Sequence, residues 1–189
     1  MVDADGLHEP KGHATATNRQ IWLSNGAGSG AFSNTITNCH AQIEITDNTT
    51  AKAMTAAADA ALSTNTDYTK LTGAAFPWTA KYTSNITFST DKLIVPFAGY
   101  YIVSFWGSFL IDVVNTFIGI KYAINDTTPY SVQKLITQAA TANYIKLLSA
   151  TFMVGPLNAN DSLSLYLAST KAANVTMKDG GFMVAYLHA

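Results

Sequence analysis

Charge is what this sequence has least of. Only 12% of its 189 residues are charged, and 11 basic residues against 12 acidic ones leave a formal net charge of −1. This balance excludes the basic surface with which proteins bind nucleic acid and the polybasic segments that hold proteins on anionic lipids. The one cysteine, Cys39, cannot form a disulfide within the chain, which excludes a disulfide-stapled scaffold. The hydrophobic fraction of 48% is nevertheless enough for the core of one domain.

Targeting signals are also missing. Residues 1–12 contain acidic side chains and no apolar stretch, which argues against export through a signal peptide. Residues 93–111 carry no charge over 19 positions, about the length of a membrane-spanning helix. Pro96, Gly99 and Gly107 interrupt this segment, and most of its other residues are aromatic or β-branched. The segment therefore predicts strands and no association with a membrane.

Hydrophobic and polar residues alternate in several short segments between residues 76 and 189. The clearest are residues 85–89, 117–124 and 162–167. Period-two alternation predicts half-buried strands, and many such strands without strong helical patterns predict an all-β sandwich or barrel. The side chains expected to point inward are Ile86, Phe88, Ile118, Ile120, Tyr122, Ile124, Leu163, Leu165 and Leu167, and those expected on the outward face are Lys121, Ser162 and Ser164.

Weaker patterns precede this region. Residues 20–24 and 41–46 predict two further strands. The alanine-rich residues 52–62 fit either a short helix or a loop, because their apolar side chains fall on every face. Glycine, proline and asparagine mark turns, among them residues 155–156 and 179–181. We expect an extended N-terminal arm over residues 1–32 and one sandwich domain over residues 33–189.

Two predicted strands are apolar on both faces. In residues 100–111, one parity holds Tyr101, Val103, Phe105, Phe109 and Ile111, and the other holds Tyr100, Ile102, Trp106 and Leu110. Residues 182–187 divide in the same way, with Phe182, Val184 and Tyr186 opposite Met183, Ala185 and Leu187. Such strands must be covered on both faces, and the chain has little spare apolar helix to cover them. We therefore predict a subunit interface that contains Tyr100, Ile102, Trp106, Leu110, Phe182, Val184 and Tyr186. The alternative is that Trp106 and Tyr186 are only partly exposed.

Residues 76–189 resemble the trimeric TNF/C1q-like jelly roll. The runs that carry the resemblance are LIVPFAGYY at 93–101, IGIKYAIN at 118–125, LNANDSL at 157–163 and GGFMVAYL at 180–187. The resemblance implies an antiparallel jelly-roll sandwich and a homotrimer. It also implies that the two doubly apolar strands lie side by side in the sheet that packs around the three-fold axis.

The N-terminal segment resembles a part of tailed-bacteriophage structural proteins. The matching runs are GLHEPKG at 6–12 and IWLSNGAGSGAF at 21–32. This resemblance implies a virion component on the capsid surface, either a capsid decoration protein or a head fibre. It implies attachment to the major capsid protein or another virion protein through Leu7, His8, Glu9, Pro10, Lys11 and Gly12.

Two other functions stay open at this stage. One is a tail-fibre or receptor-binding tip that recognises a host surface glycan through loops such as residues 125–130 and 169–174, with Trp22, Trp78 and Tyr130 as exposed aromatic candidates; for Trp78 we expect a place at one end of the sandwich. The other is a secreted TNF/C1q-like ligand, against which the missing signal peptide and collagen-like repeat argue.

No catalytic or cofactor motif stands out. The glycines at residues 26–30 lack the Lys-Ser/Thr of a phosphate loop and the helix that follows a dinucleotide loop. His8, His13, Cys39 and His40 have no spacing that closes a structural metal site. Cys39 and His40 point to opposite faces of a strand and cannot form a dyad, so we expect a buried Cys39. The sequence predicts neither an enzyme nor a bound cofactor or metal.

Overall fold

The computed structural model describes residues 21–24, 30–33, 39–127, 135–139 and 141–188. The chain divides into two compact units, Met1–Asn38 and Cys39–Ala189. In the first unit, β1 (Ile21–Ser24) and β2 (Gly30–Ser33) form an antiparallel hairpin whose register pairs Trp22 with Phe32. The strand predicted at residues 20–24 is therefore confirmed. The predicted attachment residues 7–12 and the turn at residues 25–29 lie outside the described residues.

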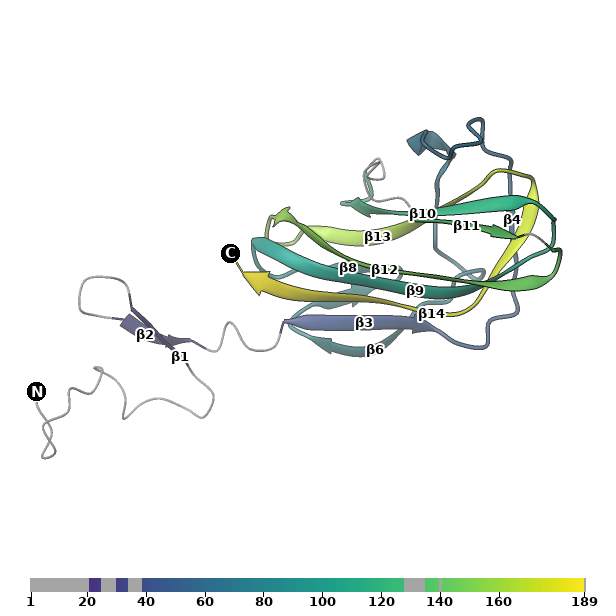
Figure 1. Ribbon diagram of the computed structural model, residues 1–189. Coiled ribbons are helices and arrows are strands. Elements are labelled where there is room, and N and C mark those ends of the chain that lie inside the picture. The colour runs from purple at the N-terminus through teal and green to yellow at the C-terminus, as the bar shows by residue number, and fades with distance from the viewer. Residues whose placement is uncertain (1–20, 25–29, 34–38, 128–134, 140, 189) are drawn as a thin grey trace, which may run out of the picture. The chain divides into compact units, whose positions relative to one another are not determined.

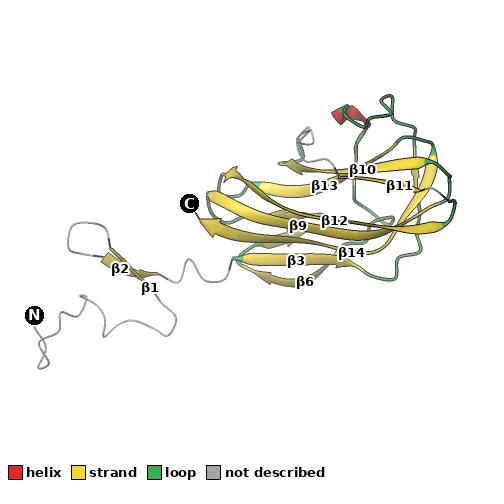
Figure 2. Ribbon diagram, viewed as in Figure 1, coloured by secondary structure: helices red, strands yellow, loops and turns green. Residues whose placement is uncertain are grey.

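The second unit contains two six-stranded sheets, whose strands pair antiparallel and which lie one above the other (Figures 1 and 2). We call them sheet I and sheet II. Sheet I has the order β12 (Tyr144–Leu157), β9 (Gly99–Ile111), β14 (Ala173–His188), β3 (His40–Ile45) and β6 (Thr79–Ser84), with β4 (Lys52–Met54) paired to β14. Sheet II has the order β11 (Leu135–Ala139), β10 (Thr116–Ile124), β13 (Ser162–Ser169), β8 (Lys92–Ile94) and β7 (Thr87–Ser89), with β5 (Thr69–Lys70) paired to β13. A 3₁₀ turn, η2, spans Asn65–Asp67.

The core lies between the two sheets, and each sheet contributes one face to it. The alternate residues of β9 from Tyr101 onward are buried, and so are the apolar residues expected inward on β10 and β13, except the half-buried Ile124. This confirms the period-two reading of these strands. The two doubly apolar strands β9 and β14 pair over nearly their full lengths, as the family resemblance implied. Residues 93–111 form β8, the following turn and β9, and no helix in the described part of the chain is long and apolar enough to cross a membrane.

Three polar residues predicted to face solvent are buried instead. Lys121 is 1% exposed, because residues 62–68 fold over the outer face of sheet II. Ser162 and Ser164 are covered by the turn at Asn125 and Asp126. The Asn125 side chain accepts a hydrogen bond from the Ser162 backbone N–H, and the Ser164 hydroxyl donates to Asp126. Alternation placed the three side chains on the outer face of sheet II correctly. The connecting loops cover that face, so the side chains are buried.

Residues 52–62 follow the loop alternative except at β4 and contain no helix, since only Met54 and Leu62 of this stretch are buried and alanines supply no continuous apolar stripe. Two turn predictions need correction. Residues 179–181 are not a turn between strands. They lie inside the 16-residue strand β14, where the register with β9 shifts between Met177 and Asp179. Gly155–Pro156 likewise falls within β12, at the point where its register with β9 shifts. Such β-bulges interrupt a ladder without ending it. Gly155 lies at the bulge of β12, whereas Gly180 and Gly181 follow the bulge of β14 and pair regularly with Gly107 and Trp106.

One smaller prediction is confirmed. Cys39 is 6% exposed and belongs to the main core. Trp78 is buried, and its indole N–H donates a hydrogen bond of 2.9 Å to the Leu71 carbonyl. The loop that precedes β6 is therefore fastened onto the sandwich by a large aromatic side chain, and Trp78 is not an exposed glycan contact.

Candidate functional site

Most of the large hydrophobic side chains that are exposed in the described chain lie on the outer face of sheet I. Residues paired directly across an antiparallel ladder share a face, so Trp106 of β9 lies on the same side as Ser149 of β12 and Gly181 of β14. We call this side the open face. Its apolar side chains are Tyr100, Ile102, Trp106 and Leu110 on β9, Ile145, Leu147 and Met153 on β12, Met183 and Ala185 on β14, and Tyr82 on β6.

The apolar side chains of the open face are unusually exposed for their size. Leu147 is 79% exposed, Met153 56% and Ile145 49%, and the Trp106 indole is 39% exposed. Scattered exposed hydrophobic residues are normal, but contiguous patches on a monomer mark interaction surfaces. The open face gathers such residues on two strands that are hydrogen-bonded to each other, with the polar pair Ser104 and Thr151 between Met153 and the group around Trp106.

The predicted interface residues divide between the two faces of sheet I. Tyr100, Ile102, Trp106 and Leu110 share the open face, in agreement with their common parity, and their place in a subunit interface stays a prediction. Phe182 and Val184 do not, since they pair with Phe105 and Val103 and are 1% and 0% exposed inside the core. Their place in an interface was a wrong prediction. Tyr186 is half-buried and packs edge-on against Tyr101 and Phe97, with ring centroids 5.2 and 6.1 Å apart.

Sequence reasoning missed part of the open face. Ile145, Leu147 and Met153 were not predicted, because the serine and threonine of β12 share their parity while Leu148 and Phe152 lie on the other, so neither face of the strand stands out as apolar in the sequence. What the sequence lacked was the pairing partner, since β12 joins sheet I only through its register with β9. Met183 was assigned to the opposite parity from Phe182 and proves to be the residue of that pair on the open face.

Charge is nearly absent from this surface. None of the outward residues of β9, nor any described outward residue of β12, is charged. At the β6 margin, Lys81 Nζ and Glu44 Oε2 form an ion pair of 2.8 Å, so the two charges neutralise each other. On β14, an oxygen of the Asp179 carboxylate accepts a hydrogen bond of 3.0 Å from the Asp47 backbone N–H. A surface of this kind suits an apolar, uncharged partner.

The open face contains a recess of about 450 Å³ beside the Trp106 indole. Its lining is mainly apolar and consists of Trp106, Gly107, Ser108, Leu147, Leu148, Ser149 and Asp179. The hydroxyl of Ser108 is already engaged with the backbone of Asp179 at the bulge of β14. The recess therefore offers hydrophobic contact more than hydrogen bonding.

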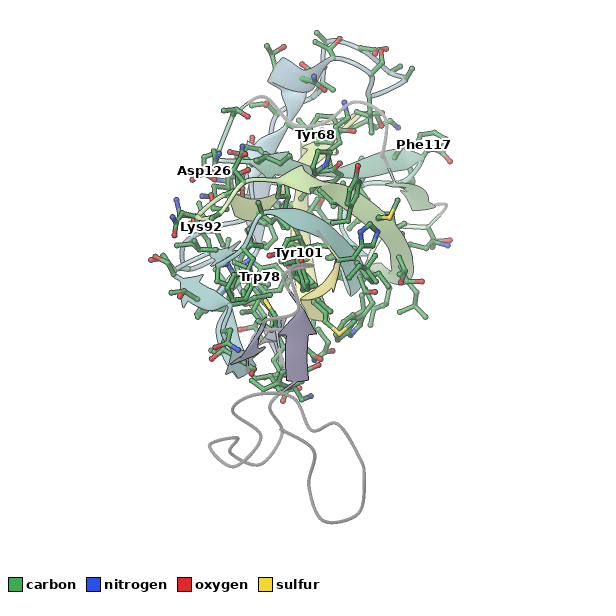
Figure 3. The ribbon with its side chains drawn as sticks, turned by 90° about the vertical axis from the view of Figure 1, so that its left-hand side faces the viewer. Tyr68, Trp78, Lys92, Tyr101, Phe117 and Asp126 are labelled. Atoms are coloured by element: carbon green, nitrogen blue, oxygen red, sulfur yellow. The ribbon has the colours of Figure 1, made fainter. Side chains whose placement is uncertain are left out.

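A second cluster lies on the outer face of sheet II, around the buried Lys121. Its Nζ donates hydrogen bonds to the Ser63 carbonyl at 3.2 Å and to Asn65 Oδ1 at 2.5 Å, and it lies 4.4 Å from the centre of the Tyr68 ring (Tyr68 is labelled in Figure 3). Burial raises the pKa of Tyr68, and the charges of Asp67 and Asp59 raise it further. The Tyr68 hydroxyl donates to the Leu62 carbonyl. These contacts fasten residues 62–68 to sheet II, a structural role.

A third cluster joins the turn at Asp126 to sheet II, beside Lys92 in Figure 3. Lys70 contacts Asp126 at 2.6 Å and Asp91 at 2.9 Å, and Lys92 contacts Asp126 at 3.0 Å. Burial by itself would raise the pKa of Asp126, but hydrogen bonds from Lys70, Ser164 and Lys92 outweigh it and lower that pKa to about 2. Every charge in the cluster has a partner within it, so the cluster offers no open ligand position.

Neither catalysis nor metal binding gains support from these clusters. Within the described residues, no three histidine, cysteine or acidic side chains come close enough together to hold a metal ion. Cys39 is buried, and burial raises the pKa of its thiol, which makes the reactive thiolate scarcer. The open face is therefore the candidate site, as a surface for contact with another protein.

Comparison with known proteins identifies the fold. No protein-family model matches the chain, and no curated protein sequence matches it. Among solved structures, the globular domain of zebrafish complement 1qA aligns with a TM-score of 0.52 and 8% identity, over 80% of this chain and 98% of that domain. The Eiger TNF of S. frugiperda aligns with a TM-score of 0.50 and 13% identity, over 80% of this chain and 94% of the other. The sandwich of this chain has the TNF/C1q-like fold.

Proposed function

We propose that the chain is a non-enzymatic structural protein that assembles into a homotrimer through the open face and is held on a virion by its N-terminal arm. The observation that carries the proposal is the exposure of Leu147, Met153 and Trp106 on one nearly uncharged face. Covering such a face removes apolar area from water at about 25 cal/mol per Å². A second copy of the chain fits it, because the apolar side chains of two such faces can cover each other and few charges lie between them.

Three copies are favoured over two by the resemblance of residues 76–189 to trimeric TNF/C1q-like domains. In that arrangement, the sheet that contains β9 and β14 surrounds the three-fold axis. Trp106 and the residues beside it on β12 and β14 then lie between subunits. A trimer also explains the low charge of the chain, since the surface that other copies cover does not need charged side chains.

The virion part of the proposal is supported by the resemblance of residues 6–12 and 21–32 to phage structural proteins. The hairpin β1–β2 belongs to a unit of its own, separate from the sandwich. A two-stranded hairpin is marginally stable by itself in water, so a partner surface would hold it in place. Three arms on one trimer raise the overall affinity by orders of magnitude over one arm, because the second and third contacts form at high effective concentration.

The attachment role is tested by removing residues 1–32 and measuring binding to purified particles from which the protein has been stripped. We expect the truncated chain to keep its mass in solution and to lose binding. The control is full-length Trp106→Lys, which keeps the arm and loses the trimer, and should bind with a single arm's weak affinity. Unchanged binding of the truncated chain would refute the attachment role. Binding of the truncated chain to a glycan array would instead support a receptor-binding tip.

A further inference from the structure

The Trp106 indole lies flat against β14 at Gly181. A Cβ atom built on Gly181 would lie 2.6 Å from Cε2 of the indole and closer still to Cζ2 and Cη2. Real Cβ atoms do not approach other atoms this closely, so the ring takes the space that a side chain at residue 181 would need. Glycine is required here for space, since its φ lies outside the positive range that side chains avoid.

This placement gives the recess one of its walls. The indole forms one side, and Leu147, Leu148 and Ser149 of β12 form another. The volume of about 450 Å³ is far more than one water molecule requires. An apolar recess of this size on an exposed face is a place where an inserted side chain would be desolvated on several sides.

We propose that this recess is the anchor pocket of the trimer: it receives an apolar side chain of a second copy, and Gly181 is the positioning residue that keeps it open. The inference rests on the proposed function, because it assigns an occupant from the assembly itself. The recess is continuous with the rest of the open face. The outward positions of β9 and β12 beside it carry no charge, and the one carboxylate in its lining, that of Asp179, accepts a hydrogen bond from the Asp47 backbone N–H. Binding energy in interfaces concentrates in such central, aromatic-walled pockets.

Two substitutions close the recess from opposite sides. Gly181→Ala displaces the indole from its seat on β14, because the new Cβ overlaps the ring. Ser149→Trp fills the recess from β12, where the side chain is exposed and a larger one is compatible with the folded protomer. Ser149→Ala is the matched control, since it changes the same position without adding volume.

The measurement is the protein concentration at which half of the full-length chain is assembled, obtained by sedimentation velocity over a dilution series. We expect Gly181→Ala and Ser149→Trp to raise this concentration at least tenfold, and Ser149→Ala to leave it within threefold of wild type. Circular dichroism at a concentration where wild type is dissociated checks that each variant folds. If Gly181→Ala does not fold, Ser149→Trp alone decides the outcome.

The failures of the two proposals are distinguishable. A wild-type chain that never assembles would refute the trimer and the anchor pocket together. A wild-type trimer whose midpoint is unchanged by a folded Ser149→Trp variant would refute the anchor pocket and leave the trimer standing. A midpoint raised equally by Ser149→Trp and Ser149→Ala would also refute it, because the effect would then not depend on filling the recess.

Discussion

The Nζ of Lys121 lies 4.4 Å from the centre of the Tyr68 ring, beneath a loop that excludes water from the ammonium group. The ammonium is surrounded by groups that favour its charged form: two oxygen acceptors and the electron-rich face of an aromatic ring. A buried charge is tolerated only where such partners replace its hydration. The lysine thereby fastens residues 62–68 to β10.

Lys121→Ala should destabilise the chain by about 2–4 kcal/mol, since it removes charge-assisted hydrogen bonds and leaves a cavity. Lys121→Met keeps most of the volume and should cost about 1 kcal/mol, because its acceptors come from a loop that can regain water. Urea unfolding at one fixed protein concentration measures the free energy of unfolding of both variants. Equal stability of wild type and Lys121→Ala would contradict the role assigned to this lysine.

Gly119→Ala should destabilise the same loop by a different route. A Cβ at residue 119 would lie 2.5 Å from the Tyr68 hydroxyl oxygen, which donates to the Leu62 carbonyl. Overpacking of this kind costs about 1–3 kcal/mol. In the Tyr68→Phe background the clashing atom is absent, so the additional loss from Gly119→Ala should be smaller. A double-mutant cycle measures this coupling, and additive losses would rule the contact out.

Asp126 should make stability depend on pH in the acid range. Its pKa in the folded chain is about 2, below its ordinary value of 3.8. A depressed pKa contributes stability that is present above the unfolded value and is lost as the pH falls toward the folded value. The stability difference between wild type and Asp126→Asn should therefore be constant above pH 5 and shrink between pH 4 and 2. Because Asp126 is partly exposed, we expect a difference of about 1 kcal/mol that falls in high salt. A difference that grows on acidification would contradict this assignment.

Neighbouring residues on β14 should separate folding from assembly. Phe182→Ala removes a ring buried in the core and should cost about 3–5 kcal/mol of protomer stability. Met183→Ala removes a side chain from the open face, so it should leave the dissociated protomer nearly as stable and raise the half-assembly concentration. Thermal unfolding of dilute samples measures the stability of the protomer, and sedimentation of concentrated samples measures assembly. The opposite pattern would mean that the two faces of sheet I have been exchanged.

Much of the sandwich follows from local pattern. The alternation in β10 and β13 arises because a pleated strand sends successive side chains to opposite faces, so Ile120 and Leu165 were placed in the core correctly. The two strands apolar on both faces, β9 and β14, were recognised by the same rule. The fold class follows from the number of such strands and the lack of helical periodicity.

The remainder depends on contacts between distant segments. Parity separates Phe182 from Met183 but does not say which faces the core until the register with Phe105 is known. A bulge in β14 shifts that register, and the glycines that follow it led the sequence analysis to predict a turn there. Lys121 is outward by alternation yet buried, because a loop more than 50 residues earlier in the chain covers it. The second apolar parity was recognised on β9, and the apolar residues of β12 on the same face were missed.

The central claim is the trimer, and the molar mass of the full-length chain in solution tests it most directly. Light scattering coupled to size exclusion at micromolar concentration should give three times the 20.2 kDa of the single chain. Trp106→Lys places a charge in the middle of the open face and should reduce the mass to that of one chain without loss of strand content by circular dichroism. A wild-type mass equal to one chain, or to two, at this concentration would contradict the account.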